Sequence, residues 1–234
     1  MANTNSTSPP NWGSDGITKY IDSCRQNQHA TFANKNSVAP LKRIDLCFRK
    51  VLDKPINPRP FFPIQFLYRA HGAFLAACGL AMAGQTFEVN ALLRLSLESA
   101  AYGFYINKDQ NRAELWLSRH DGAANMKKVL KEFHITKIRE HMVLNAPKIA
   151  VIFNTLYERT IDYGAHPNER GFSSSTMINE KGDHTEFLQI YLQDDNIQLD
   201  LALKTTAQVG VWALSIFQLI YPEKWELLGI KHEL

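Results

Sequence analysis

Apolar residues recur about every 3.6 positions along most of the chain after residue 63, and this period predicts helices. The segment 86–106 is apolar nearly all round, so we expect it at the centre of the fold. The segment 110–133 mixes apolar side chains with many charges and should lie on the outside, with Gly122 as a candidate break. The predicted helices cover residues 64–83, 86–106, 110–133, 136–143, 147–163 and 197–221.

The pattern before residue 64 is different. Residues 1–16 are rich in Asn, Ser, Thr and Pro, which is typical of a disordered tail. Residues 17–54 have room for two short helices, the second from about Leu41 to Asp53. The next segment, PINPRPFFP, holds four prolines and is predicted to be an extended connector. Residues 17–63 therefore form N-terminal helices and a connector.

The helical period also stops before the last long helix. The segment GFSSSTMINEKGDHTEFLQIYLQDD alternates enough to predict a β-hairpin that turns at Glu180 to Asp183. The predicted fold class is all-α: residues 64–234 form a single helical bundle with a small β-hairpin insert at about 170–194.

Composition and charge narrow the class without naming a function. The 234 residues are 45% hydrophobic and 21% charged, as expected for a globular domain with one sizeable core. The net charge of +3 is mild and does not by itself indicate a nucleic-acid partner. Cys24, Cys47 and Cys78 have no metal-like spacing, and this cysteine usage is typical of a reducing compartment.

The chain ends carry two targeting clues. The first residues, MANTNSTSPP, lack the basic and apolar regions of a secretory signal, so we expect a cytoplasmic protein with no membrane partner. The last four residues, KHEL, look like an endoplasmic-reticulum retrieval signal, but without a leader we interpret that match as accidental.

Arg94 and Glu98 form the most informative polar pair. They lie one helical turn apart inside the apolar segment 86–106, on the stripe that also carries Ala101 and Tyr105. Charged side chains are seldom fully buried unless they are paired, so we expect an ion pair within the core. Its role is either to hold helices in register or to line a ligand pocket.

Three more side chains are candidates for a site. His166 follows Gly164 and precedes Pro167, so it is expected at the rim of the bundle, either as an acid or base or as a cap of the helix end. Tyr68 and His71 lie on the helix before Arg94 and join the candidate ligand-binding set; the alternative for His71 is a core histidine. No Glu has a His three positions later, so we predict no metal site of the ferritin type and no cofactor.

The strings LLRLSLESAAYGFYI and ERTIDYGAHPN together resemble a set of bacterial helical proteins of unknown function. Those proteins share a central Arg-x-x-x-Glu helix and a later His-Pro turn, and we regard them as relatives of the HEPN class of all-α domains, which includes abortive-infection and toxin ribonucleases. The resemblance covers residues 64–168 and the last long helix, and it leaves out the first 60 residues and the hairpin insert.

The HEPN resemblance implies a catalytic pair. Ribonucleases of this class carry Arg, a polar residue and, several positions later, His; Arg159, Thr160 and His166 match that spacing. The resemblance implies metal-independent RNA cleavage, with His166 as acid or base and Arg159 steadying the phosphate, at a site formed across a homodimer. The chain departs from the signature at Thr160, where Asn, Asp or His is usual, and Gly164 and Pro167 interrupt the helix.

Two hypotheses follow. The first is a non-catalytic α-helical module that binds a small ligand or a partner, in stress or phage defence. The second is a HEPN-type ribonuclease that uses Arg159 and His166.

Overall fold

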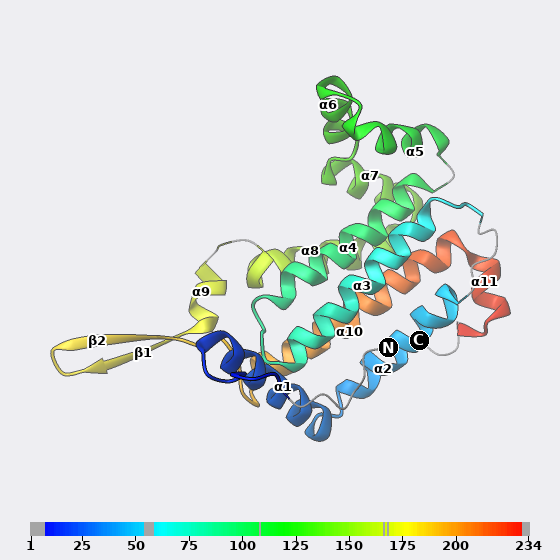
Figure 1. Ribbon diagram of the computed structural model, residues 1–234. Coiled ribbons are helices and arrows are strands. Elements are labelled where there is room, and N and C mark those ends of the chain that lie inside the picture. Colours follow the sequence, from blue (N-terminus) through cyan, green and yellow to red (C-terminus); the bar gives the residue numbers. More distant parts are fainter. Residues whose placement is uncertain (1–7, 54–58, 108, 166, 168, 231–234) are drawn as a thin grey trace.

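The computed structural model describes residues 8–53, 59–107, 109–165, 167 and 169–230 (Figure 1). These residues form eleven α-helices and one two-stranded hairpin, so the predicted all-α fold with a hairpin before the last long helix is confirmed. The α-helices are α1 Gly16–Asn34, α2 Val38–Leu52, α3 Pro63–Met82, α4 Val89–Ile106, α5 Gln110–Leu117, α6 Ala123–Glu132, α7 Ile135–Asn145, α8 Pro147–Thr160, α9 Glu169–Ser175, α10 Ile197–Ile220 and α11 Pro222–Leu227.

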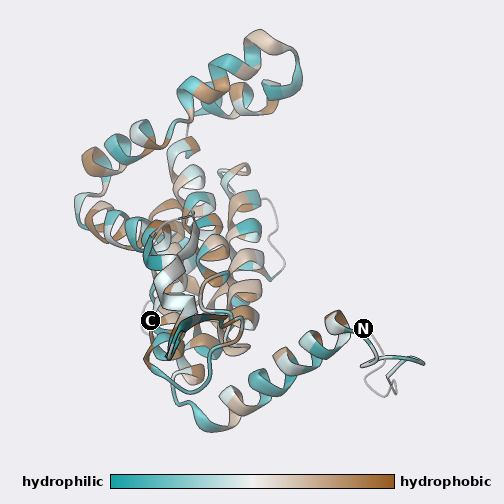
Figure 2. Ribbon diagram, turned by 90° about the vertical axis from the view of Figure 1, so that its left-hand side faces the viewer, coloured by the Kyte–Doolittle hydropathy of each residue, from teal (hydrophilic) through white to brown (hydrophobic). Residues whose placement is uncertain are grey.

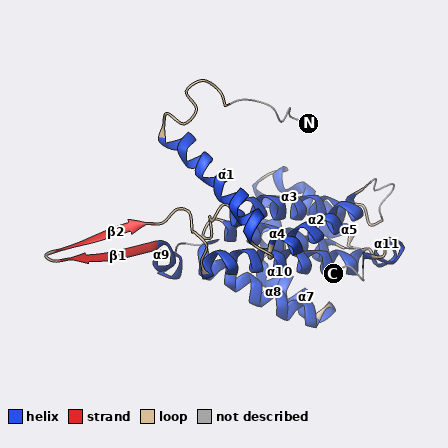
Figure 3. Cartoon of the chain, turned by 90° about the horizontal axis from the view of Figure 1, so that it is seen from below, coloured by secondary structure: helices blue, strands red, loops and turns tan. Residues whose placement is uncertain are grey.

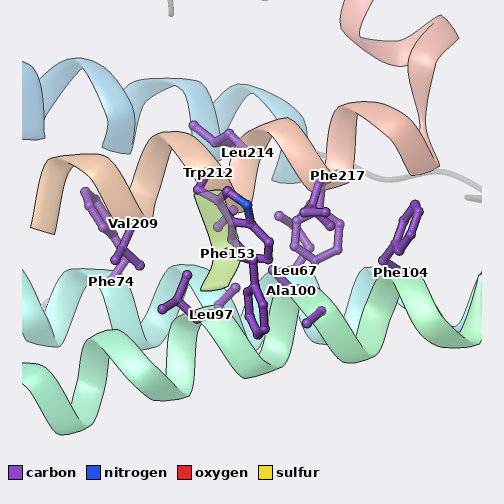
Figure 4. Close-up of a cluster of buried hydrophobic side chains, with 14 of the residues drawn as sticks. Leu67, Phe74, Leu97, Ala100, Phe104, Phe153, Val209, Trp212, Leu214 and Phe217 are labelled. Carbon is purple, nitrogen blue, oxygen red and sulfur yellow. The ribbon is translucent and has the colours of Figure 1, made fainter. Parts of the chain in front are cut away.

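Helices α3, α4 and α10 pack against one another and form the centre of the bundle, with α2 and α8 against α10 (Figure 1). Their facing side chains are fully covered: Phe74, Leu97 and Phe217 each have 0% exposure. Phe153 of α8 joins the same cluster and lies 5.1 Å from the Trp212 ring, centroid to centroid (Figure 4). Burial of this apolar surface is the main stabilising term of the fold.

Helices α5, α6 and α7 form an arm at one end of the bundle (Figure 1). The helix expected over 110–133, with Gly122 as a candidate break, is divided in two: α5 ends at Leu117, a 3-10 turn follows over Ser118–His120, and α6 begins at Ala123. Gly122 makes the break, because its φ of 124° lies where residues with a Cβ are strained. Hydropathy colouring shows apolar residues concentrated in the central helices and mixed colours on the arm (Figure 2).

The hairpin is shorter than predicted. Its strands are β1 Thr176–Lys181 and β2 His184–Gln189, and Gly182 and Asp183 form the turn. The preceding residues are helical in α9 rather than extended, and within that helix the hydroxyls of Ser173, Ser174 and Ser175 bond to backbone carbonyls three or four residues earlier. The hairpin extends away from the helices in two perpendicular views (Figures 1 and 3).

Helix α2 packs against α3 and α10, whereas α1 contacts mainly α3 and projects from the bundle (Figures 2 and 3). Helix α1 is bound to the end of α3 by side-chain bonds to backbone carbonyls, among them Thr31 Oγ1 to Met82 O at 2.9 Å. Residues 8–15 form turns, and Trp12 donates to Asp22 over 2.8 Å; residues 1–7 of the predicted tail lie outside the described residues. Helix α2 begins at Val38, three residues before the predicted start. Among the described helices, none has the length and apolar character that crossing a membrane requires.

Candidate functional site

Arg94 and Glu98 on α4 and Tyr157 on α8 form a closed hydrogen-bonded network. Arg94 Nε donates to Glu98 Oε1 over 2.8 Å, and Arg94 Nη2 donates to the Tyr157 hydroxyl over 2.7 Å. That hydroxyl donates onward to the same Glu98 oxygen over 3.0 Å. The guanidinium carbon also lies 4.9 Å from the centre of the Tyr157 ring. The network therefore ties the central helix to α8.

The pair is half-buried, which corrects the expectation of an ion pair sealed within the core. The Arg94 side chain is 22% exposed and the Glu98 side chain 32% exposed. Their stripe on α4 faces α8 and the arm rather than α3 and α10; Ala101 and Tyr105 farther along it are buried. Because water reaches the pair, its loss costs less than the 3–5 kcal/mol roughly expected for a fully buried pair.

The network lines a cavity of about 280 Å³ between the bundle and the arm, which we name the Arg94 cavity. Helices α4 and α8 supply the polar wall, and the arm supplies most of the opposite wall. The lining residues are Arg94, Glu98, Tyr102, Trp116, Arg119, Val129, Leu130, Phe133, His134, Ile135 and Tyr157.

Three of the lining side chains form an aromatic cluster. The Trp116 and Phe133 rings lie 5.0 Å apart, and Tyr102 stacks on Phe133 at 5.6 Å. The Tyr102 hydroxyl donates to the Phe133 backbone carbonyl over 2.9 Å, which joins the arm to the bundle. Aromatic contacts of this kind hold rings in defined orientations. The cavity therefore has one charged wall and one rigid aromatic wall.

Burial and the Glu98 carboxylate keep the two phenols of the cavity protonated. Burial, followed by the nearby negative charge of Glu98, raises the pKa of Tyr157 to about 12. The same two causes, in the same order, raise the pKa of Tyr102. At neutral pH both hydroxyls are neutral hydrogen-bonding groups; Arg94 and Glu98 are the charged side chains of the polar wall, and Arg119 lies on the arm opposite them.

His71 and Tyr68 lie elsewhere, so the structure does not unite them with Arg94 and Glu98. Nε2 of His71 lies 2.7 Å from Oδ1 of Asp45 on α2, and its ring stacks on Phe48 at 4.9 Å. His71 is 8% exposed, which agrees with the alternative of a satisfied core histidine. Tyr68 is 43% exposed, and neither residue lines the Arg94 cavity.

The residues of the HEPN-like spacing are only partly described. Arg159 Nη1 donates to Gln208 Oε1 over 2.7 Å and lies 3.4 Å from Thr205 Oγ1, both on α10. Thr160 has 0% exposure and bonds to the Tyr157 carbonyl, and helix α8 then changes to a π-helical turn over Ile161–Ala165. His166 lies outside the described residues, so its distance from Arg159 stays open.

Gly164 allows the backbone to bend at that turn. Its φ is 148°, and a Cβ at this position would lie 2.3 Å from the Phe87 carbonyl oxygen. Asn90 Nδ2 fixes the same turn by donating to the Tyr163 carbonyl over 2.9 Å. The chain therefore leaves α8 at a defined angle just before His166.

Arg159 lies where two further hollows meet. The larger, which we name the Arg159 groove, has a volume of about 560 Å³ and runs between α2, α8 and α10. A smaller pocket of about 230 Å³ lies on the other side of Arg159, beside Asn90 and Tyr163. The groove is lined by Pro40, Arg43, Ile44, Ile149, Val151, Ile152, Thr155, Leu156, Arg159, Ala207, Gln208, Val211, Trp212 and Ser215.

Comparison with protein-family models, with curated proteins and with solved structures found no match. Among the described residues, no group of three or more His, Cys, Asp or Glu side chains is placed to hold a metal ion.

Sequence reasoning missed the partners of the Arg94 pair. Tyr157 lies on the inward face of its helix with Phe153. The apolar pattern could therefore predict that Tyr157 is buried, but it could not predict its contact with α4. Trp116 and Arg119 come from the arm, whose fold-back depends on the break at Gly122. Apolar periodicity shows which face of a helix is inside, not which helix it meets.

Proposed function

We propose that the chain is a non-catalytic binding module whose Arg94 cavity holds a small planar ligand. The observation that carries this proposal is the joining of a charged wall and an aromatic wall around one cavity. Its volume of about 280 Å³ suits one or two fused rings, since pockets for drug-sized molecules begin at about 300 Å³.

The chemistry of the walls narrows the ligand class. The guanidinium of Arg94 is a donor, and the carboxylate of Glu98 beside it is an acceptor. A ligand edge that carries an acceptor next to a donor, as in an amide or a nucleobase, matches this pair. The Trp116 and Phe133 rings offer apolar surface for the face of such a ring. We therefore expect a heteroaromatic ligand with an amide-like edge.

Saturation-transfer NMR on the full chain tests the proposal. The probes are one-ring and two-ring heteroaromatic fragments, with adenine, uracil and nicotinamide among them. We expect probes of the amide-edge type to bind, and Arg94→Gln or Glu98→Gln to weaken them about tenfold, the effect of one charged hydrogen bond.

Arg139→Gln is the matched control. Arg139 also stacks on the Tyr157 ring, at 4.6 Å, but it does not line the cavity. Binding that survives Arg94→Gln and Glu98→Gln, or that falls equally in Arg139→Gln, contradicts the proposal. Circular dichroism of each variant separates a lost site from a lost fold.

A further inference from the structure

The hairpin exposes apolar side chains on both of its faces. Ile178 pairs with Phe187, and Met177 pairs with Leu188, so each pair lies on one face of the two-stranded ribbon. These side chains are 56%, 65%, 49% and 47% exposed, in that order. A two-stranded hairpin is only marginally stable on its own, and exposed strand edges are normally covered in native proteins. The hairpin therefore has the character of an element that packs against another surface.

The face that carries Ile178 and Phe187 has a charged end. Two residues farther along the same face, toward the turn, Glu180 pairs with Thr185. The turn adds Asp183, and Lys181 is bound to Glu186 over 2.8 Å. The tip thus has an excess of negative charge next to two large apolar side chains.

The Arg159 groove has the opposite character. Its floor and walls are mostly apolar; Val151 is 67% exposed and Ile152 is 47% exposed. It carries two cationic side chains, Arg43 and Arg159, and no Asp or Glu is among its described lining residues. The hydrogen bonds that hold Arg159 in place come from neutral partners on α10, so its charge is not balanced by them.

We infer that the Arg159 groove docks the hairpin of a second copy of this chain. Ile178 and Phe187 fit the apolar floor, and Glu180 meets the arginines at the rim. The hairpin extends away from its own helices (Figures 1 and 3), so the contact is between copies. A two-fold axis makes the exchange reciprocal, with each copy giving one hairpin and one groove.

The charge of the groove also argues against a dimer in which two Arg159 grooves pack face to face. Two grooves placed face to face bring the two Arg159 side chains to the same interface, and the described lining of each groove holds no carboxylate. Like charges brought together at an interface are repulsive, whereas the hairpin tip brings a negative charge to Arg159, whose hydrogen-bond partners on α10 are neutral. The hairpin of a second copy is thus complementary to the groove in both its apolar surface and its charge.

Light scattering on the full chain at micromolar concentrations gives the first test. We expect a dimer mass for the unaltered protein and for Leu117→Ser, and a monomer mass for Phe187→Ser. Leu117 is a matched control because it is also apolar and 65% exposed, but lies on the arm. A monomeric unaltered protein, or a Phe187→Ser dimer of unchanged affinity, overturns the inference.

A charge exchange tests the ionic part. Glu180→Arg and Arg159→Glu should each raise the dimer dissociation constant about tenfold, the size of one interface charge pair. The two changes in one chain should restore the dimer, because they exchange the partners without removing the pair. A double variant weaker than either single variant contradicts the pairing.

Cross-linking identifies the contact itself. Cys47 is 1% exposed, and burial raises the pKa of the Cys78 thiol to about 12, so replacement of Cys24 alone gives an unreactive background. In that background one protein carries Thr185→Cys, which keeps Phe187 on the same face of the hairpin, and another carries Thr155→Cys in the groove lining. A short bismaleimide should link the two in a mixture and link neither protein to itself. Linkage within Thr185→Cys alone indicates hairpin-to-hairpin pairing and overturns the inference, as does a mixture with no cross-link.

Discussion

Large apolar side chains are buried at the centre of the bundle but exposed on the hairpin. Phe217, in the last turn of α10, has 0% exposure and contacts the other central helices (Figure 4). Phe187, in β2, is 65% exposed. The centre of the bundle therefore buries its apolar surface within one chain, whereas the hairpin leaves its apolar side chains exposed to solvent. We therefore expect the stability of this protein and its proposed association to depend on separate elements, so that single substitutions change one without the other.

The largest expected effect comes from truncating the same residue type in the two regions. Phe217→Ala should lower the free energy of unfolding by about 3–5 kcal/mol, because it removes a fully buried ring and leaves a cavity among α3, α4 and α10. Phe187→Ala should change it by less than about 0.5 kcal/mol in the dilute monomer. Urea unfolding followed by circular dichroism measures both.

The control for this pair is Phe153→Ala. Phe153 is also fully buried but comes from α8, at the side of the central helices. We expect a loss similar to that of Phe217→Ala. A loss of several kcal/mol in Phe187→Ala at low concentration would show instead that the hairpin belongs to the cooperative unit of the bundle.

The sequence predicted the bundle well for a physical reason. The helices around Phe74, Leu97 and Phe217 are long and strongly periodic, and their predicted bounds agree with α3, α4 and α10 to within three residues. The segments it mispredicted are short and polar. The break at Gly122 was a candidate in the sequence, whereas α9 was missed, because its seven mostly polar residues carry no apolar period.

The second expected effect concerns the pH dependence of stability, which we compare for a carboxylate of the bundle, Asp45, and one of the hairpin, Glu180. Burial alone would raise the pKa of Asp45, but hydrogen bonds from Arg49 and His71 outweigh it and lower that pKa. A carboxyl with a lowered pKa in the folded state stabilises the protein above its unfolded pKa of about 3.9, and the contribution disappears as the pH falls through the folded value.

Acid unfolding of Asp45→Asn therefore distinguishes the two regions. Between about pH 6 and pH 3 the unaltered protein should lose about 1 kcal/mol more stability than Asp45→Asn, the size of a hydrogen bond to a charged group. In the dilute monomer, Glu180→Gln on the exposed hairpin should keep the pH dependence of the unaltered protein. Denaturant midpoints over this range give the comparison, and equal slopes for Asp45→Asn and the unaltered protein would contradict it.

The candidate site was less predictable than the fold. Arg94 and Glu98 were visible because charges stand out in an apolar helix, and their ion pair is local. The cavity around them is not local, since Tyr157 and Trp116 come from separate helices. The one-turn spacing of a pair follows from helix geometry, whereas the walls of a cavity follow from tertiary packing, which no period in a single sequence encodes.

The smallest expected effect concerns the junction between bundle and hairpin, where the ribonuclease hypothesis places its site. Thr160 is fully covered and its hydroxyl is bonded to the Tyr157 carbonyl, so it cannot contact a phosphate beside Arg159 without local rearrangement. We therefore expect that, in EDTA, the unaltered protein leaves RNA intact or cleaves it no more than His166→Ala does. Total cellular RNA incubated with the two purified proteins and resolved on a denaturing gel gives the measurement. EDTA-resistant cleavage by the unaltered chain, lost in His166→Ala and in Arg159→Gln but kept in Arg139→Gln, would make this junction an active site and would remove the non-catalytic proposal.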